Sequence, residues 1–129
     1  MLGADILVNF HQNWSRVLLI YTIAVALWGI FLFLRKRNPS GGYLGALIIA
    51  EGIVLIQGVI GILLVAGGHR PHNGLHFLYG FVAAIALPGA YGFSSLSQGG
   101  SERRDSLIMG LASLFLFGIS IRAITTGGS

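Results

Sequence analysis

Four long apolar runs constrain what this chain can fold into. They cover residues 17–34, 43–66, 75–93 and 107–124. Each run has about the 20 residues that a helix needs to cross the hydrocarbon core of a bilayer. The connections are short and rich in glycine, serine or proline, and such connections place consecutive helices side by side and antiparallel. We therefore expect an all-α integral membrane protein, a four-transmembrane-helix up-down bundle that forms one membrane domain over residues 1–129.

The composition supports lipid as the solvent of this chain and excludes several classes of function. Charged residues make up 9% of the sequence, against roughly 25% in soluble domains. Cysteine is absent, which excludes disulfides, thiolate metal ligands and thiol catalysis. The net charge is +4, but most basic residues flank the apolar runs and form no patch with interleaved aromatic residues. We therefore expect the lipid bilayer as a partner and no nucleic acid.

The distribution of Lys and Arg predicts the orientation in the membrane, because cytoplasmic connections carry an excess of both. The connections after the first and third runs hold five basic residues: Arg35, Lys36, Arg37, Arg103 and Arg104. The opposite end holds three: Arg16, Arg70 and Arg122. The prediction is a bacterial inner-membrane protein with both termini, and the connection between the second and third runs, on the outer side. The "RKR" after the first run is typical of a retained span rather than a cleaved signal peptide.

Histidines gather at this predicted outer end. Three of the four lie between residues 69 and 76, and the fold brings His11 to the same end. One interpretation is that they are interfacial side chains that bind water and lipid head groups, and His69, in the connection beside Arg70, fits it. A second is a haem held by imidazoles from two helices of an antiparallel bundle. A third is a metal site of His11, His72 and His76, and a fourth is one imidazole on the magnesium of a chlorophyll-type pigment.

The haem interpretation requires room for the ring, cations for its propionates, and ligands at equal depth. Small residues follow each candidate ligand: Gly80 after His76, and Ser15, Thr22, Ala26 and Gly29 after His11. Arg16, Arg70 and Arg122 are the available cations. By residue count His11 lies roughly 35 Å, and His76 roughly 26 Å, from the inner ends of their helices. His72 is therefore an alternative ligand; it is spaced i, i+4 with His76, and Pro71 suits the first turn of a helix that contains both.

Two polar residues lie inside the second run. A carboxyl group at the position of Glu51 is costly in lipid and is therefore a candidate for proton transfer or for pairing with a neighbouring subunit. Its alternative role is a neutral carboxyl bonded within the bundle. Gln57 is a candidate hydrogen-bond link between helices.

The strings "IQGVIGILLVAGG" (residues 56–68) and "GLHFLYGFVAAIAL" (residues 74–87) are similar to one four-helix half of the haem A synthase family. The resemblance covers residues 11–93, and it implies a bundle with a bis-histidine haem b near its outer face. It implies His11, Gln57, Gly61 and His76 as the matching positions. The family's arginine after the first histidine is Gln12 here, its preceding acidic residue is missing, and its cysteine pair is absent. These departures favour a haem scaffold over synthase activity.

The leading hypothesis is a membrane-embedded haem b-binding protein for electron transfer or haem handling, with the iron between His11 and His76. We do not expect the chain to be an enzyme on its own. The rival hypothesis is a non-catalytic accessory subunit that packs against a larger respiratory or photosynthetic membrane complex, with a chlorophyll-type pigment or no cofactor. The near absence of sequence outside the four runs, together with "GGYLG" at the start of the second, suits such lateral helix contacts.

Overall fold

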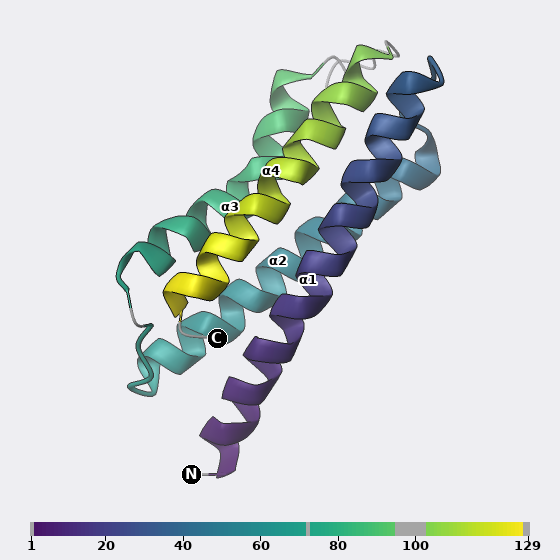
Figure 1. Cartoon of the computed structure of the whole chain (residues 1–129). Helices are drawn as coiled ribbons and strands as arrows, with labels where there is room; N and C mark the ends of the chain where they lie inside the picture. Colours follow the sequence, from purple (N-terminus) through teal and green to yellow (C-terminus); the bar gives the residue numbers. More distant parts are fainter. Residues whose placement is uncertain (1, 72, 95–102, 128–129) are drawn as a thin grey trace.

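The computed structural model describes residues 2–71, 73–94 and 103–127 and confirms the all-α prediction. The described residues form four helices and no strand: α1 (Leu2–Leu34), α2 (Gly41–Ala66), α3 (Leu75–Phe93) and α4 (Arg104–Gly127). Both ends of the chain lie at the same end of the bundle (Figure 1). Helix α4 packs against α1 and α3, and α2 packs against α1, whereas α2 and α3 have little mutual contact.

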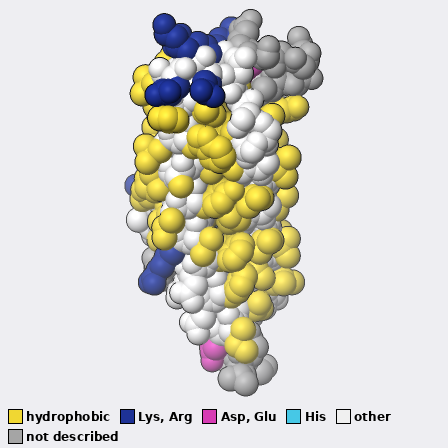
Figure 2. Space-filling model, turned by 90° about the vertical axis from the view of Figure 1, so that its right-hand side faces the viewer, with side chains coloured by type: hydrophobic (Ala, Val, Ile, Leu, Met, Phe, Trp, Pro, Cys, Tyr) yellow, Lys and Arg dark blue, Asp and Glu magenta, His cyan; other side chains and the backbone are white. Residues whose placement is uncertain are grey.

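All four helices are long and apolar enough to cross a membrane. Their outward faces carry large apolar side chains that water would not tolerate in such numbers. Ile20, Ile48 and Ile62 are each 70% exposed or more, and Phe93 is 83% exposed. Apolar side chains cover much of the visible face between the two ends of the molecule (Figure 2). The chain is therefore an integral membrane protein whose apolar exterior faces lipid.

The helix bounds agree with the predicted runs except at the beginning of α1. Helices α2, α3 and α4 begin and end within three residues of the predicted spans. The apolar run begins at residue 17, whereas the helix that contains it begins at Leu2. Polar residues such as Asp5, Asn9 and Asn13 interrupt the apolar run but not the backbone hydrogen bonds. The 33 residues of α1 span about 50 Å against a hydrocarbon core of about 30 Å, so its first turns extend beyond the apolar layer.

The ends of α1 and α2 show why the chain reverses where it does. Lys36 has a φ of 57°, and the N–H of Arg37 donates to the carbonyl of Leu32 over 2.8 Å. Gly68, with a φ of 93°, makes the corresponding reversal after α2. These are left-handed residues that close a helix and satisfy its last carbonyl groups.

Helices α1 and α4 approach each other closely at Gly29 and Gly110. A Cβ atom added to Gly29 would lie 2.7 Å from the Cα atom of Gly110 and against the Tyr43 hydroxyl. Thr22 and Ala26, which share this face of α1, have no exposed surface. The small residues of α1 that suggested room for a cofactor therefore let α4 approach, because close backbone packing is what holds helices together in lipid.

Candidate functional site

The two best-placed histidines meet at the end of the bundle that contains both termini. His11 of α1 and His76 of α3 have ring centroids 6.2 Å apart, and their ring planes are inclined at 73°. Both side chains are half-buried. Helices α1 and α3 have almost no other contact, because α4 lies between them on one side of the bundle. A count of residues places His11 and His76 at different distances from the inner ends of their helices. In the folded bundle the two imidazoles nevertheless lie beside each other.

One nitrogen of His76 is already engaged. His76 Nδ1 lies 2.7 Å from the backbone oxygen of Ala123 in α4. A carbonyl oxygen only accepts hydrogen bonds, so Nδ1 carries the proton and Nε2 has the free lone pair. A backbone carbonyl that fixes the tautomer and the orientation of the ring is the usual outer partner of a metal-ligating histidine.

Gln57 of α2 holds the other histidine. Its Nε2 donates to the backbone oxygen of His11 over 2.8 Å. His11 Nδ1 and Gln57 Oε1 are both buried, and neither has a hydrogen-bond partner within the described residues. Gln57 is thus the hydrogen-bond link between helices that the sequence suggested, and it lies beside a candidate ligand.

Two glycines near the histidine pair differ in their surroundings. A Cβ atom added to Gly61 would lie 3.5 Å from Cε1 of His11, so the edge of the ring already lies against this part of α2. Gly80, one turn after His76 on α3, is exposed, and a Cβ atom added there would meet nothing within 4 Å. The bundle itself therefore does not need glycine at position 80, and the space beside it is free of protein atoms.

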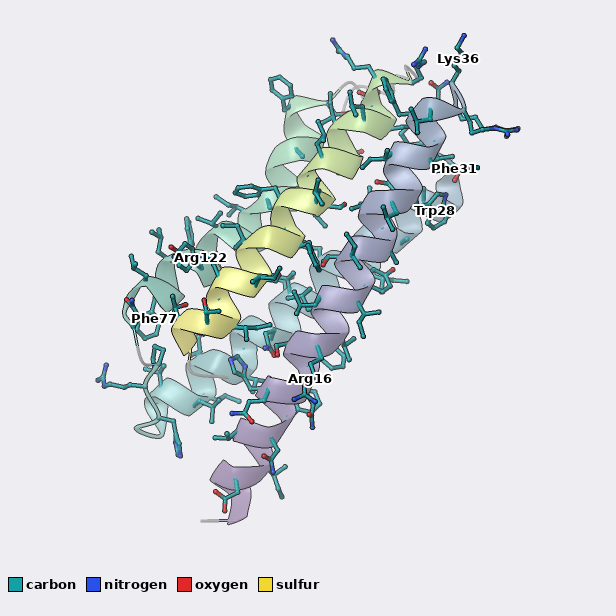
Figure 3. The ribbon with its side chains drawn as sticks, viewed as in Figure 1. Arg16, Trp28, Phe31, Lys36, Phe77 and Arg122 are labelled. Atoms are coloured by element: carbon teal, nitrogen blue, oxygen red, sulfur yellow. The ribbon has the colours of Figure 1, made fainter. Side chains whose placement is uncertain are left out.

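The three candidate arginines are placed differently. Arg122, next to Ala123 in α4, has its Cζ atom 5.8 Å from the ring centroid of Tyr79, three residues after His76. Arg16 lies on α1 in the half of the bundle that also contains Arg122 and Phe77 (Figure 3). Arg70 is exposed in the connection before α3. Arg122 is therefore the arginine that lies closest along its helix to the His76 partner Ala123 and that contacts α3.

The remaining histidines do not complete a metal cluster within the described residues. His69 is exposed, and His72 lies outside the residues that the structure describes. Helix α3 begins at Leu75, whose N–H donates to Asn73 Oδ1 over 2.9 Å. The prediction that Pro71 belongs to the first turn is therefore wrong, because Gly74 is the N-cap residue and Pro71 lies before it. In the described part of the chain, no three His, Asp or Glu side chains gather to hold a metal ion.

Glu51 is separate from the histidine pair. It is half-buried on α2, and its Oε1 is buried without a hydrogen-bond partner among the described residues. It lies six residues before Gln57, about 9 Å along the helix axis. Glu51 remains a candidate for a polar role inside the membrane, but it is not part of the His11–His76 site.

Comparison of the chain with protein-family models, with curated proteins and with solved structures finds no match. Its function is therefore inferred from the histidine pair and the groups around it.

Proposed function

We propose that this chain is a membrane-embedded haem b-binding protein in which His11 and His76 would hold the iron. The observation that supports the proposal is the separation of the imidazoles. A metal ion bonded at about 2 Å to one nitrogen of each of two opposed imidazoles separates their centroids by roughly 6 Å. The observed separation is 6.2 Å. A tetrahedral ion needs further ligands, which the described residues do not offer.

The surroundings of the pair fit the same group. The Ala123 carbonyl fixes the ring of His76 from behind, as the outer partner of a metal-bound histidine does, and Gln57 holds the backbone of His11. The open position at Gly80 leaves space next to His76 for a flat ring. Arg122 and Arg16 lie in this half of the molecule (Figure 3), and guanidinium groups are suited to bind propionate carboxylates.

The role that follows is electron transfer or haem handling at the outer side of a bacterial energy-transducing membrane. A bound haem supplies one-electron oxidation and reduction. The chain contributes the ligands, their orientation, and an apolar bundle that limits access of water to one end. The sidedness comes from the Lys and Arg excess at the opposite end of the bundle, which the positive-inside rule assigns to the cytoplasm.

The resemblance to one half of the haem A synthase family supports the same proposal. Its matching positions are His11, Gln57, Gly61 and His76. His76 and Gln57 interact with His11, and a Cβ atom added to Gly61 would lie 3.5 Å from its ring. We propose a haem scaffold without synthase activity, because Gln12 stands where the family has arginine and because its cysteine pair is absent.

The second candidate function is an accessory subunit of a larger respiratory or photosynthetic complex, with a chlorophyll-type pigment or none. The observation that favours it is the outer surface of α2, where Cβ atoms added to Gly45, Gly52 and Gly58 would meet nothing within 4 Å. Glycines that the bundle does not use allow close approach of a helix from another protein. An accessory subunit co-migrates with large partners when the membrane is dissolved in mild detergent, whereas a free haem protein does not.

The proposal is tested by the absorption spectrum of the protein purified in mild detergent, oxidised and then reduced with dithionite. We expect reduced haem b bands in the wild type and in the variant His69→Ala, which removes an exposed histidine outside the site. The bands should be absent from His11→Ala and from His76→Ala. Wild-type protein that stays colourless after reconstitution with haem contradicts the proposal, and far-red bands identify a chlorophyll-type pigment instead.

A further inference from the structure

Basic side chains gather at the end of the bundle opposite the histidines. Arg35, Lys36 and Arg37 follow α1, and Arg103 precedes α4; all four are exposed. Lys and Arg side chains lie together at one end of the molecule (Figure 2). The acid that the structure describes at this end, Asp105, is fully buried and accepts a hydrogen bond from Ser94. The exposed charge of this end, within the described residues, is therefore positive.

The two basic segments are held to one another. The Ser106 hydroxyl donates to the backbone oxygen of Arg37 over 2.8 Å, which joins the first turn of α4 to the segment after α1. The Gly29–Gly110 contact brings the same two helices together further along the bundle. Arg35 and Arg103 therefore lie on two backbone segments whose relative position is fixed by these contacts.

Two of these arginines lie on aromatic rings of α1. The Cζ atom of Arg103 is 4.5 Å from the ring centroid of Phe33, and that of Arg35 is 5.9 Å from the centroid of Phe31. A guanidinium group over a ring face is attracted by the ring, and its N–H groups, which lie in the guanidinium plane, stay available to acceptors. Neither side chain forms an ion pair with a described residue.

Apolar surface continues directly from these cations into the membrane. Phe31 is 56% exposed and Leu34 is 70% exposed. Both belong to the last turn of α1, at the boundary between the apolar layer and the head groups. A ligand that satisfies the whole surface has an anionic phosphate for the guanidinium groups and hydrocarbon for the exposed side chains. A soluble polyanion would leave the apolar half uncovered.

We propose that the end of α1 and the beginning of α4 form a binding site for an anionic phospholipid. Its phosphate accepts hydrogen bonds from Arg35 and Arg103, and its acyl chains lie along α1 beside Phe31. This proposal does not depend on the haem, because the two sites are at opposite ends of the bundle.

Native mass spectrometry of the protein in mixed nanodiscs tests the proposal, with phosphatidylglycerol as the probe and phosphatidylcholine as the competing lipid. We expect the wild type to retain phosphatidylglycerol preferentially. The double variant Arg35→Gln/Arg103→Gln should lose roughly 30-fold of this preference, since each basic side chain near the surface contributes about fivefold. The matched control is Arg16→Gln/Arg70→Gln, which removes two charges at the other end and should retain the preference.

Three results would overturn the proposal. The first is equal retention of both lipids by the wild type, and the second is an equal loss in both double variants, which indicates a general effect of net charge. The third is displacement of the lipid from the wild type by inorganic phosphate, which shows that the apolar half contributes nothing. The measurements of lipid retention and of displacement by phosphate use the wild type, so they test the proposal even if Arg35→Gln/Arg103→Gln fails to fold.

Discussion

Replacement of Gly29 by alanine tests how α1 and α4 are held together. The new Cβ atom would lie 2.7 Å from the Cα atom of Gly110, whereas ordinary van der Waals contact begins at 3.4 Å. The obstacle is backbone, so it cannot rotate away, and the helices must separate by at least about 0.7 Å. Overpacking of this kind costs about 1–3 kcal/mol. The buried hydroxyl of Tyr43, which lies against the same position, must move as well.

The matched control is Gly52→Ala on α2, where an added Cβ atom meets nothing within 4 Å. Alanine is intrinsically better than glycine in a helix by about 1 kcal/mol, and this gain applies to both variants. Comparison of the two therefore cancels the intrinsic effect and leaves the clash. We expect Gly29→Ala to be less stable than Gly52→Ala by about 1–3 kcal/mol.

The assay is unfolding in mixed micelles of mild detergent and dodecyl sulfate, followed by circular dichroism. Equal free energies of unfolding for Gly29→Ala and Gly52→Ala would mean that α1 and α4 do not approach at this point in the folded protein.

Two further predictions concern the histidine site. Gly80→Leu should leave the bundle as stable as the wild type or more so, because the position is open, but it should block haem uptake in a spectroscopic titration; normal uptake would show that the ring does not use this space. Gln57→Leu should weaken haem binding by about tenfold, whereas Tyr21→Phe, which removes another hydrogen bond from a side chain to the backbone between α1 and α2, should not. Equal haem affinity in these two variants would remove Gln57 from the site.

The architecture could be predicted from the sequence because lipid imposes simple requirements on length and apolarity. Runs of about 20 apolar residues with short connections leave few alternatives to an antiparallel bundle. The beginning of α1 could not be predicted in the same way. Its first turns carry Asp5, Asn9 and Asn13, and a test of apolarity detects the bilayer-spanning part of a helix rather than its continuation into water.

The histidine pair could be predicted only in part. Topology alone placed His11 and His76 at the same end, but a count of residues gave them different depths, because it ignores how the helices are tilted and offset. The groups that hold the two histidines could also be predicted only in part. Gln57 was identifiable as a polar residue in an apolar run, whereas the Ala123 carbonyl has no signal in the sequence, because a backbone group is present at every position.

The small residues of α1 show a second limit. Thr22, Ala26 and Gly29 occur at a spacing that suits either a flat cofactor or a neighbouring helix, and only the position of α4 decides between them. The structure assigns them to helix packing, since Thr22 and Ala26 are fully buried and Gly29 is in contact with Gly110. Gly80 has no such role in the bundle.

In the proposed function, His11 and His76 together bind haem iron. The most direct test is the dithionite-reduced minus oxidised difference spectrum of purified wild-type protein, recorded beside His11→Ala, His76→Ala and His69→Ala. We expect haem b bands in the wild type and in His69→Ala, and their loss in each of the other two variants. Bands of equal intensity in all four proteins, or a wild type that binds no added haem, would contradict the proposed function.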